Sequence, residues 1–177
     1  MTVIMPGIYH SGIQSIAAVA RMHSLTTLTV GCCPAIRSWA ALAYCHQLRI
    51  LGVEYDSPCD EPQCASVHVF GQLTELRELN LRNWGALSDI APLSNCQKLE
   101  ILELPNSAVQ DLTPVSSCSQ LQMLNLFGCK QLLDVSPLAR LPCLHTLDLT
   151  EGAAAISGLE WVKDCRRAIE VSGVLMF

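Results

Sequence analysis

The chain has 177 residues, of which 50% are apolar and 15% charged, and its formal net charge is −5 at pH 7. This length suits one domain with a sizeable hydrophobic core. The acidic balance excludes the basic surface by which proteins bind DNA or RNA, so no nucleic-acid partner is expected.

The N-terminal segment carries no positive charge before Arg21. A signal peptide begins with a positively charged region, and this one does not. No apolar run in the chain reaches the roughly 18 residues of a membrane span. We therefore expect a protein that is not secreted and not in a membrane, cytoplasmic in location with the nucleus as the alternative.

A repeated pattern, Leu-x-x-Leu-x-Leu with valine in the third place twice, runs through most of the chain. It begins at Leu25, Leu48, Leu76, Leu99, Leu121 and Leu144. These starts are evenly spaced, except that the interval from Leu48 to Leu76 is longer than the others. The second and third apolar residues alternate with outward ones, which is typical of a short strand. One repeat cannot bury its own apolar face, so the pattern predicts repeats stacked on one another.

Three prolines, Pro92, Pro114 and Pro137, recur at one place after these strands. Thr113 and Ser136 are interpreted as N-cap residues that precede proline at the first helical position, where its missing N–H costs nothing. Each such pair predicts a short helix or 3₁₀ turn. The recurring aspartates are expected to hydrogen-bond local backbone before the turn; they are Asp89, Asp111 and Asp134.

With its Asp-[Ile/Val/Leu]-x-Pro-[Leu/Val] signature, the repeat resembles the short leucine-rich repeats of the phosphatase-regulator and internalin types. Cysteine in place of the usual asparagine at Cys33 and Cys129, and the stretch "DVSPLARL", are similar to repeats of trypanosomatid proteins. The resemblance covers at least residues 25–149. It implies an α/β fold, a curved solenoid with short parallel strands on the concave face and short helices, 3₁₀ turns and loops on the convex face.

The whole chain, 1–177, is predicted to be a single leucine-rich-repeat domain. It divides into a degraded N-terminal repeat (1–24), clear repeats (25–165) and an incomplete C-terminal repeat (166–177). The last is expected to continue the leucine phase with Arg166, Ile169 and Val171. Neither end has the polar face of a capping repeat, which favours a fragment of a longer array or an end covered by another subunit.

The longer interval after Leu48 marks an insertion over 54–64 with two prolines and four acids, expected to loop out of the solenoid. It is either part of a binding face or a tolerated surface loop. Cys59, Cys64 and His68 form a weak candidate zinc site there, with His46 considered as a nearby fourth ligand. Because the spacing is poor, no metal or other cofactor is predicted.

Five other cysteines recur at two repeat positions, which are Cys45, Cys96 and Cys118, then Cys33 and Cys129. Stacked core positions suit small apolar side chains, so reduced structural thiols are expected, as in the cytoplasm or nucleus. The five histidines fall in different repeats and no catalytic motif occurs. The chain is predicted not to be an enzyme.

The outward strand positions should form columns across the concave face. There, Ile101, Met123 and Phe127 are expected to make an exposed apolar patch, flanked by Ile50 and Tyr55. The predicted partner-binding residues are Ile50, Tyr55, Glu78, Arg82, Ile101, Glu103, Met123, Asn125, Phe127 and Asp148. The alternative is a tolerated scatter of surface hydrophobes.

The columns and the residues just beyond them contain five acidic residues and one basic residue, Arg82. The acidic residues are Glu54, Glu78, Glu103, Asp148 and Glu151. This surface predicts a non-catalytic module that binds a protein partner with a basic or mixed apolar and basic surface. The alternatives are a structural subunit of a larger assembly or homodimer joined through its uncapped ends, or the substrate-recognition arm of a ubiquitin ligase.

Overall fold

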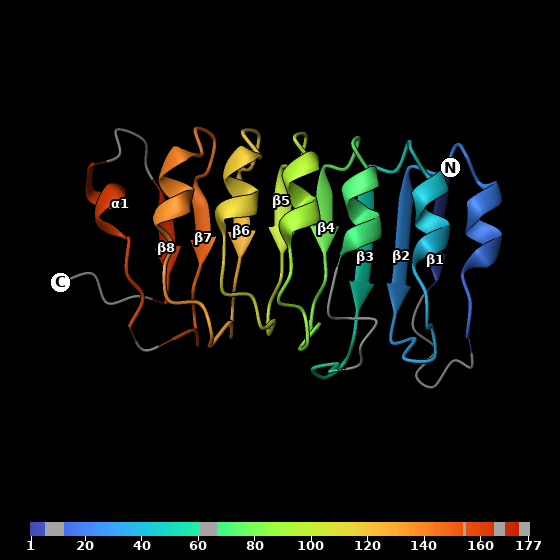
Figure 1. The fold of residues 1–177 in the computed structure, drawn as a ribbon, viewed down its shortest axis with the longest axis horizontal. Helices are drawn as coiled ribbons and strands as arrows, with labels where there is room; N and C mark the ends of the chain where they lie inside the picture. The colour runs from blue at the N-terminus through green and yellow to red at the C-terminus, as the bar shows by residue number, and fades with distance from the viewer. Residues whose placement is uncertain (6–12, 61–66, 154, 165–168, 174–177) are drawn as a thin grey trace.

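The computed structural model describes residues 1–5, 13–60, 67–153, 155–164 and 169–173. Within them, eight strands form one parallel sheet in which spatial order follows chain order (Figure 1). The strands are β1 (Thr2–Met5), β2 (Thr27–Gly31), β3 (Ile50–Glu54), β4 (Glu78–Asn80), β5 (Ile101–Glu103), β6 (Met123–Asn125), β7 (Thr146–Asp148) and β8 (Glu170–Ser172).

A layer of short helices lies against one face of this sheet (Figure 1). All but one of those described are 3₁₀ helices, which are η1 (Ala17–Arg21), η2 (Ala40–Tyr44), η4 (His68–Gln72), η5 (Ala91–Asn95), η6 (Thr113–Ser117) and η7 (Ser136–Arg140). The exception is the short α-helix α1 (Glu160–Asp164). In Figure 1 the opposite face of the sheet carries no described helix, and we call it the open face.

The sheet register follows the leucine repeat. The inward leucine of each strand pairs with that of the next, from Leu28 and Leu51 in one pair to Leu124 and Leu147 in another. These side chains are almost completely buried because they fill the space between the sheet and the helix layer. A regular sequence period therefore becomes a column of contacts, as the solenoid prediction required.

The turns before the 3₁₀ helices are closed by aspartates. Asp111 Oδ1 accepts the backbone N–H of Thr113 at 2.8 Å, and Asp134 Oδ1 accepts that of Ser136 at 2.9 Å. The predicted aspartate role is confirmed. The N-cap assignment is wrong, because Thr113 and Ser136 are already the first residues of η6 and η7, whose cap positions make no side-chain hydrogen bond.

Ala91 shows the same arrangement, since its N–H donates to Asp89 Oδ1 at 2.9 Å. The aspartate shortly upstream does this in all three repeats, and that is why a repeat with alanine before its proline needs no threonine or serine.

The last strand is out of the predicted phase. Val171 pairs with Leu147, so it occupies the second apolar position of the motif and not the third. Gly173 then lies where Leu149 lies in the preceding repeat, at a φ of +86° against the backbone of Thr150. The final repeat is thus longer than the one before it, and Arg166 lies outside the described residues.

Cys45, Cys96, Cys118 and Cys129 are buried free thiols, as predicted, and Cys33 is buried as well. The Cys45, Cys96 and Cys118 thiols each lie 3.5 Å from a backbone carbonyl oxygen of the preceding repeat. Cys129 makes the same kind of contact with Leu104 O at 3.2 Å. Burial raises the pKa of the Cys96 thiol to about 12 and that of Cys118 to about 11, so both stay protonated at neutral pH.

Candidate functional site

The open face presents the predicted outward positions in continuous columns. In the first column Ile50 pairs with Glu78, Glu78 with Ile101, and Ile101 with Met123. In the second, Glu103 pairs with Asn125 and Asn125 with Asp148; Gly52 and Asn80 precede them.

A third column lies just beyond the strands and includes Arg82, Pro105 and Phe127. Backbone hydrogen bonds join each of these residues to the repeat before it. The N–H of Asn83 donates to Pro105 O at 3.0 Å, and the N–H of Asn106 donates to Phe127 O at 2.7 Å. Tyr55 N–H bonds in the same way to Arg82 O at 3.1 Å. Residues distant in sequence are therefore held as neighbours by the ladder itself.

Ile101, Met123 and Phe127 are half-buried on this face. Ile101 and Met123 are direct register partners, and Phe127 comes shortly after the end of β6 in the same repeat as Met123. Ile101 and Met123 are therefore adjacent and partly open to solvent, and Phe127 is partly open to solvent in the third column. That the three form one patch remains a prediction. Arg82 is exposed and Ile50 is half-buried.

Tyr55 does not flank that patch, and its prediction is wrong. Its side chain is only 6% exposed, and its ring lies 6.3 Å from that of Trp84. Trp84 in turn packs against Trp39 and Phe70, with ring centroids 5.8 Å apart in both pairs. Tyr55 is the second residue of the insertion, and its ring is turned inward against Trp84.

Asn125 and Asp148, both predicted to bind a partner, have a local role as well. Asn125 Oδ1 accepts the N–H of Phe127 and Asp148 Oδ1 accepts the N–H of Thr150, each at 2.9 Å. Asn80 does the same for Arg82 at 3.0 Å. These side chains close the strand ends, so the second column is polar for a structural reason as well as a functional one.

A hollow of about 180 Å³ opens on the face above Gly52. Glycine has no side chain, and its neighbours in the second column, Thr29 and Asn80, do, so the column is indented at this point. The hollow is lined by Thr29, Ile50, Leu51, Gly52, Glu54, Glu78, Leu79, Asn80, Ile101 and Glu103. It has apolar walls and three carboxylates, and none of the Lys or Arg residues that the structure describes lines it.

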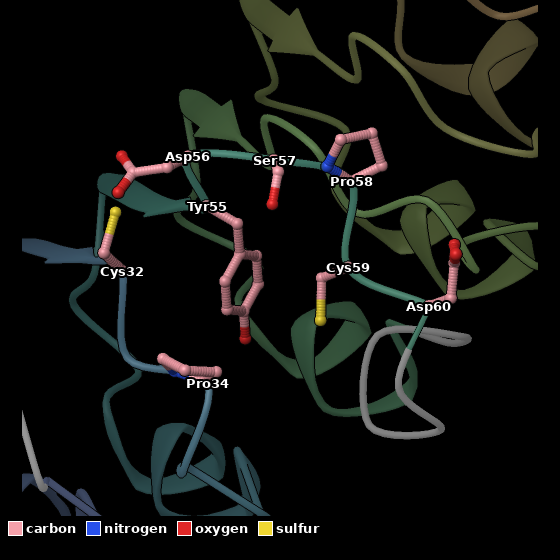
Figure 2. Close-up of a pocket in the computed structure, with 8 residues that line it drawn as sticks. All are labelled: Cys32, Pro34, Tyr55, Asp56, Ser57, Pro58, Cys59 and Asp60. Carbon is pink, nitrogen blue, oxygen red and sulfur yellow. The ribbon is translucent and has the colours of Figure 1, made fainter. Parts of the chain in front are cut away.

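A second cavity, of about 440 Å³, lies between the turn after β2 and the start of the insertion (Figure 2). In Figure 2 the Cys32 thiol lies beside the Asp56 carboxylate, and the Tyr55 ring points between Pro34 and Cys59. Burial, reinforced by hydrogen bonding to Asp56, raises the pKa of Cys32 to about 11. This thiol is therefore protonated near neutral pH and a poor nucleophile.

The described part of the insertion is fixed to the next repeat. Cys59 N–H donates to Asn83 O at 2.7 Å, and the Asn83 side-chain amide donates to Tyr55 O at 2.6 Å. Asp60 and Pro58 lie against Gly85, where an added Cβ would overlap the Asp60 carboxylate. Tyr55 and Cys59 are thus buried against the solenoid, while Asp56, Ser57, Pro58 and Asp60 are exposed as expected of a loop, and residues 61–64 lie outside the described residues.

The candidate zinc ligands are not brought together within the described residues. Cys64 lies outside them, and no group of three metal-ligating side chains occurs in the part that is described. His68 lies 3.9 Å from Asp89, with side chains 79% and 45% exposed. Asp89 also accepts a backbone hydrogen bond that closes the turn before η5, which explains its position without a bound metal.

No protein-family model matches the sequence, and no curated protein matches it either. Among solved structures, internalin C2 from Listeria monocytogenes matches with a TM-score of 0.74 and 23% identity, over 92% of this chain and 67% of that one. Internalin F from the same organism matches with a TM-score of 0.55 and 16% identity, over 93% of this chain and 58% of that one. This chain has the leucine-rich-repeat fold.

Within this leucine-rich-repeat solenoid, the sequence analysis located the columns but missed the Gly52 hollow. The available signal was a glycine in a column whose other strand members carry side chains. The similarity to trypanosomatid repeats remains a prediction. No helix among the described residues is both long and apolar enough to cross a bilayer.

Proposed function

We propose that this protein is a non-catalytic protein–protein interaction module that binds its partner on the open face of the sheet. The observation that supports the proposal is an apolar row on this face. It consists of half-buried Ile101 and Met123, which are neighbours across β5 and β6, together with half-buried Phe127 beyond the end of β6. Such side chains have no core to fill on this face, and apolar clusters at a surface tend to mark contact sites.

The surrounding charge indicates the kind of partner. Glu78 and Glu103 lie beside the apolar row in the first and second columns, and Glu54 and Asp148 are also half-buried on this face. A protein segment with apolar and basic side chains would complement this surface. Nucleic acid would be repelled, so we expect no oligonucleotide binding even at low salt.

Substitution of Phe127 by aspartate tests the proposal. Immobilised full-length protein would be exposed to a cell extract, and the captured proteins compared among wild type, Phe127→Asp and Leu133→Asp. Leu133 is 61% exposed and lies outside the columns, so it controls for adding the same charge elsewhere. We expect capture of a defined partner to be lost only with Phe127→Asp, at an unchanged melting temperature. Undiminished capture by that variant would contradict the proposal.

We also propose a reducing compartment, the cytoplasm or the nucleus. The support is the repeated placement of cysteine in the core, where each buried thiol lies against a backbone carbonyl of its neighbour. Such positions use cysteine as a small apolar side chain. Secretion of the intact protein by its native cell would contradict this proposal.

A second candidate function is self-assembly through the ends of the solenoid. β1 and β8 are the outermost strands of the described sheet, and an edge strand can pair with another chain. Light scattering coupled to size exclusion at several concentrations distinguishes the two functions. A constant mass of 19.3 kDa would argue against assembly, and a mass that grows with concentration would favour it.

A further inference from the structure

We propose that the hollow above Gly52 is the anchor site for an arginine side chain of the partner protein. This inference rests on the proposed function, because the partner must reach the open face. It names the chemistry of one subsite on that face.

The shape of the hollow suits a long side chain with an apolar stem. Its floor is Gly52, where the column loses a side chain, and two isoleucines, Ile50 and Ile101, line it in the neighbouring column. The methylene groups of arginine bury well against such walls and leave the charged head near the rim. A free carboxylate or phosphate would meet apolar groups and acids here, and would bind poorly.

The charge of the hollow selects a cation. Glu54, Glu78 and Glu103 line it from three adjacent strands, β3, β4 and β5. The Asn80 amide donates to Glu54 Oε1 at 3.1 Å, which orients that carboxylate. A planar guanidinium with five N–H donors can bond two carboxylates at once, which an ammonium does less well.

The cations nearest in sequence do not neutralise these acids. Arg49 and Arg77 precede β3 and β4 and do not line the hollow, and Arg77 is paired with Glu100. Arg82, in the third column, is exposed and also absent from the lining. The three carboxylates therefore present a net negative charge that an incoming arginine would balance.

The test uses the full chain labelled with ¹⁵N and a blocked tripeptide, acetyl-Ala-Arg-Ala-amide, at low ionic strength. We expect saturable shifts of the Gly52 amide and its strand neighbours. The matched peptide with citrulline, which has the shape of arginine but no charge, should bind at least about tenfold more weakly. A lysine peptide should fall between the two.

Two variants locate the site. Gly52→Val should abolish the shifts by filling the hollow. A Cβ at Gly52 meets nothing closer than Thr29 Cγ2 at 3.4 Å, and the circular dichroism spectrum of the variant would check that it folds. Glu78→Gln should weaken binding several-fold. Glu170→Gln changes net charge equally and lies in the same column on β8, so it should have no effect.

Three outcomes would overturn the anchor: no saturable shift at Gly52 in the wild type, equal binding of the citrulline peptide, or unchanged binding by folded Gly52→Val. Partner capture that is lost with Phe127→Asp but indifferent to Gly52→Val would refute the anchor and leave the proposed function standing. Arginine binding at Gly52 without any effect of Phe127→Asp on capture would refute the proposed function and leave the arginine site standing.

Discussion

The two halves of this solenoid fill their cores and connect their strands in different ways. From β5 to β7 the strands are short, the motif starts are evenly spaced, and η5, η6 and η7 each contain a proline. From β2 to β4 two strands are longer, the interval between Leu48 and Leu76 is extended, and neither η2 nor η4 contains proline. In the regular half, stacked leucines fill the core and aspartates close the turns, without additional elements.

The irregular half needs additional elements because its longer repeat leaves volume that leucine does not fill. Four aromatic rings occupy that volume, centred on Trp84, whose indole N–H donates to Val53 O at 2.9 Å. The pocket beside Cys32 lies in this half, and the Gly52 hollow lies at its boundary with the regular half, since Ile101 and Glu103 of β5 also line it. The comparison teaches that departures from the repeat add cavities beside a surface whose apolar row lies in the regular half.

Removal of the central ring should have the largest effect on stability. Trp84→Ala deletes a fully buried side chain and its hydrogen bond, so we expect a loss of about 3–5 kcal/mol in the free energy of unfolding. Urea denaturation followed by circular dichroism would measure it. Trp84→Phe, which keeps most of the ring volume, should lose less. A loss below about 1 kcal/mol for Trp84→Ala would mean that the aromatic cluster does not support the irregular half.

Two glycines, one in each half, should respond oppositely to alanine. Gly128 has a φ of +69°, and a Cβ there would overlap Asn106 Oδ1, so Gly128→Ala should destabilise by about 1–2 kcal/mol or more. Gly52 has ordinary backbone geometry and room for a Cβ, so Gly52→Ala should be neutral or stabilise by up to about 1 kcal/mol. Thermal unfolding followed by circular dichroism would compare them, and similar melting temperatures for both variants would contradict this distinction.

The aspartate-closed turns of the regular half predict a small dependence of stability on pH. Hydrogen bonds from Thr113 and Ser136 hold the pKa of Asp111 and of Asp134 below the ordinary value of 3.8. Their contribution is therefore fully present above pH 3.8 and is lost as pH falls through the lowered folded-state pKa. The Asp111→Asn, Asp134→Asn double variant should be slightly less stable than wild type at neutral pH, and the difference should shrink in acid. A difference in melting temperature that stays constant from neutral pH into strong acid would contradict this origin.

The fold could be predicted because the leucine period is both a sequence pattern and a contact pattern. Each leucine meets its counterpart one repeat away, so counting residues also assigns register, and the pairing of Ile101 with Met123 follows directly. The burial of the repeated cysteines could be predicted in the same way, because they also recur at fixed repeat positions. The phase failed at β8, where the repeat lengthens and no leucine marks the register.

The sequence by itself determined the solenoid, its columns and its acidic open face, because these depend on residues that recur at fixed spacing. Only the tertiary structure decided the inward turn of Tyr55, the packing of the insertion against Gly85, and the depth of the hollow above Gly52. Each depends on which side chains a neighbouring repeat supplies at that register, and a residue's exposure is set by those neighbours and not by its own identity.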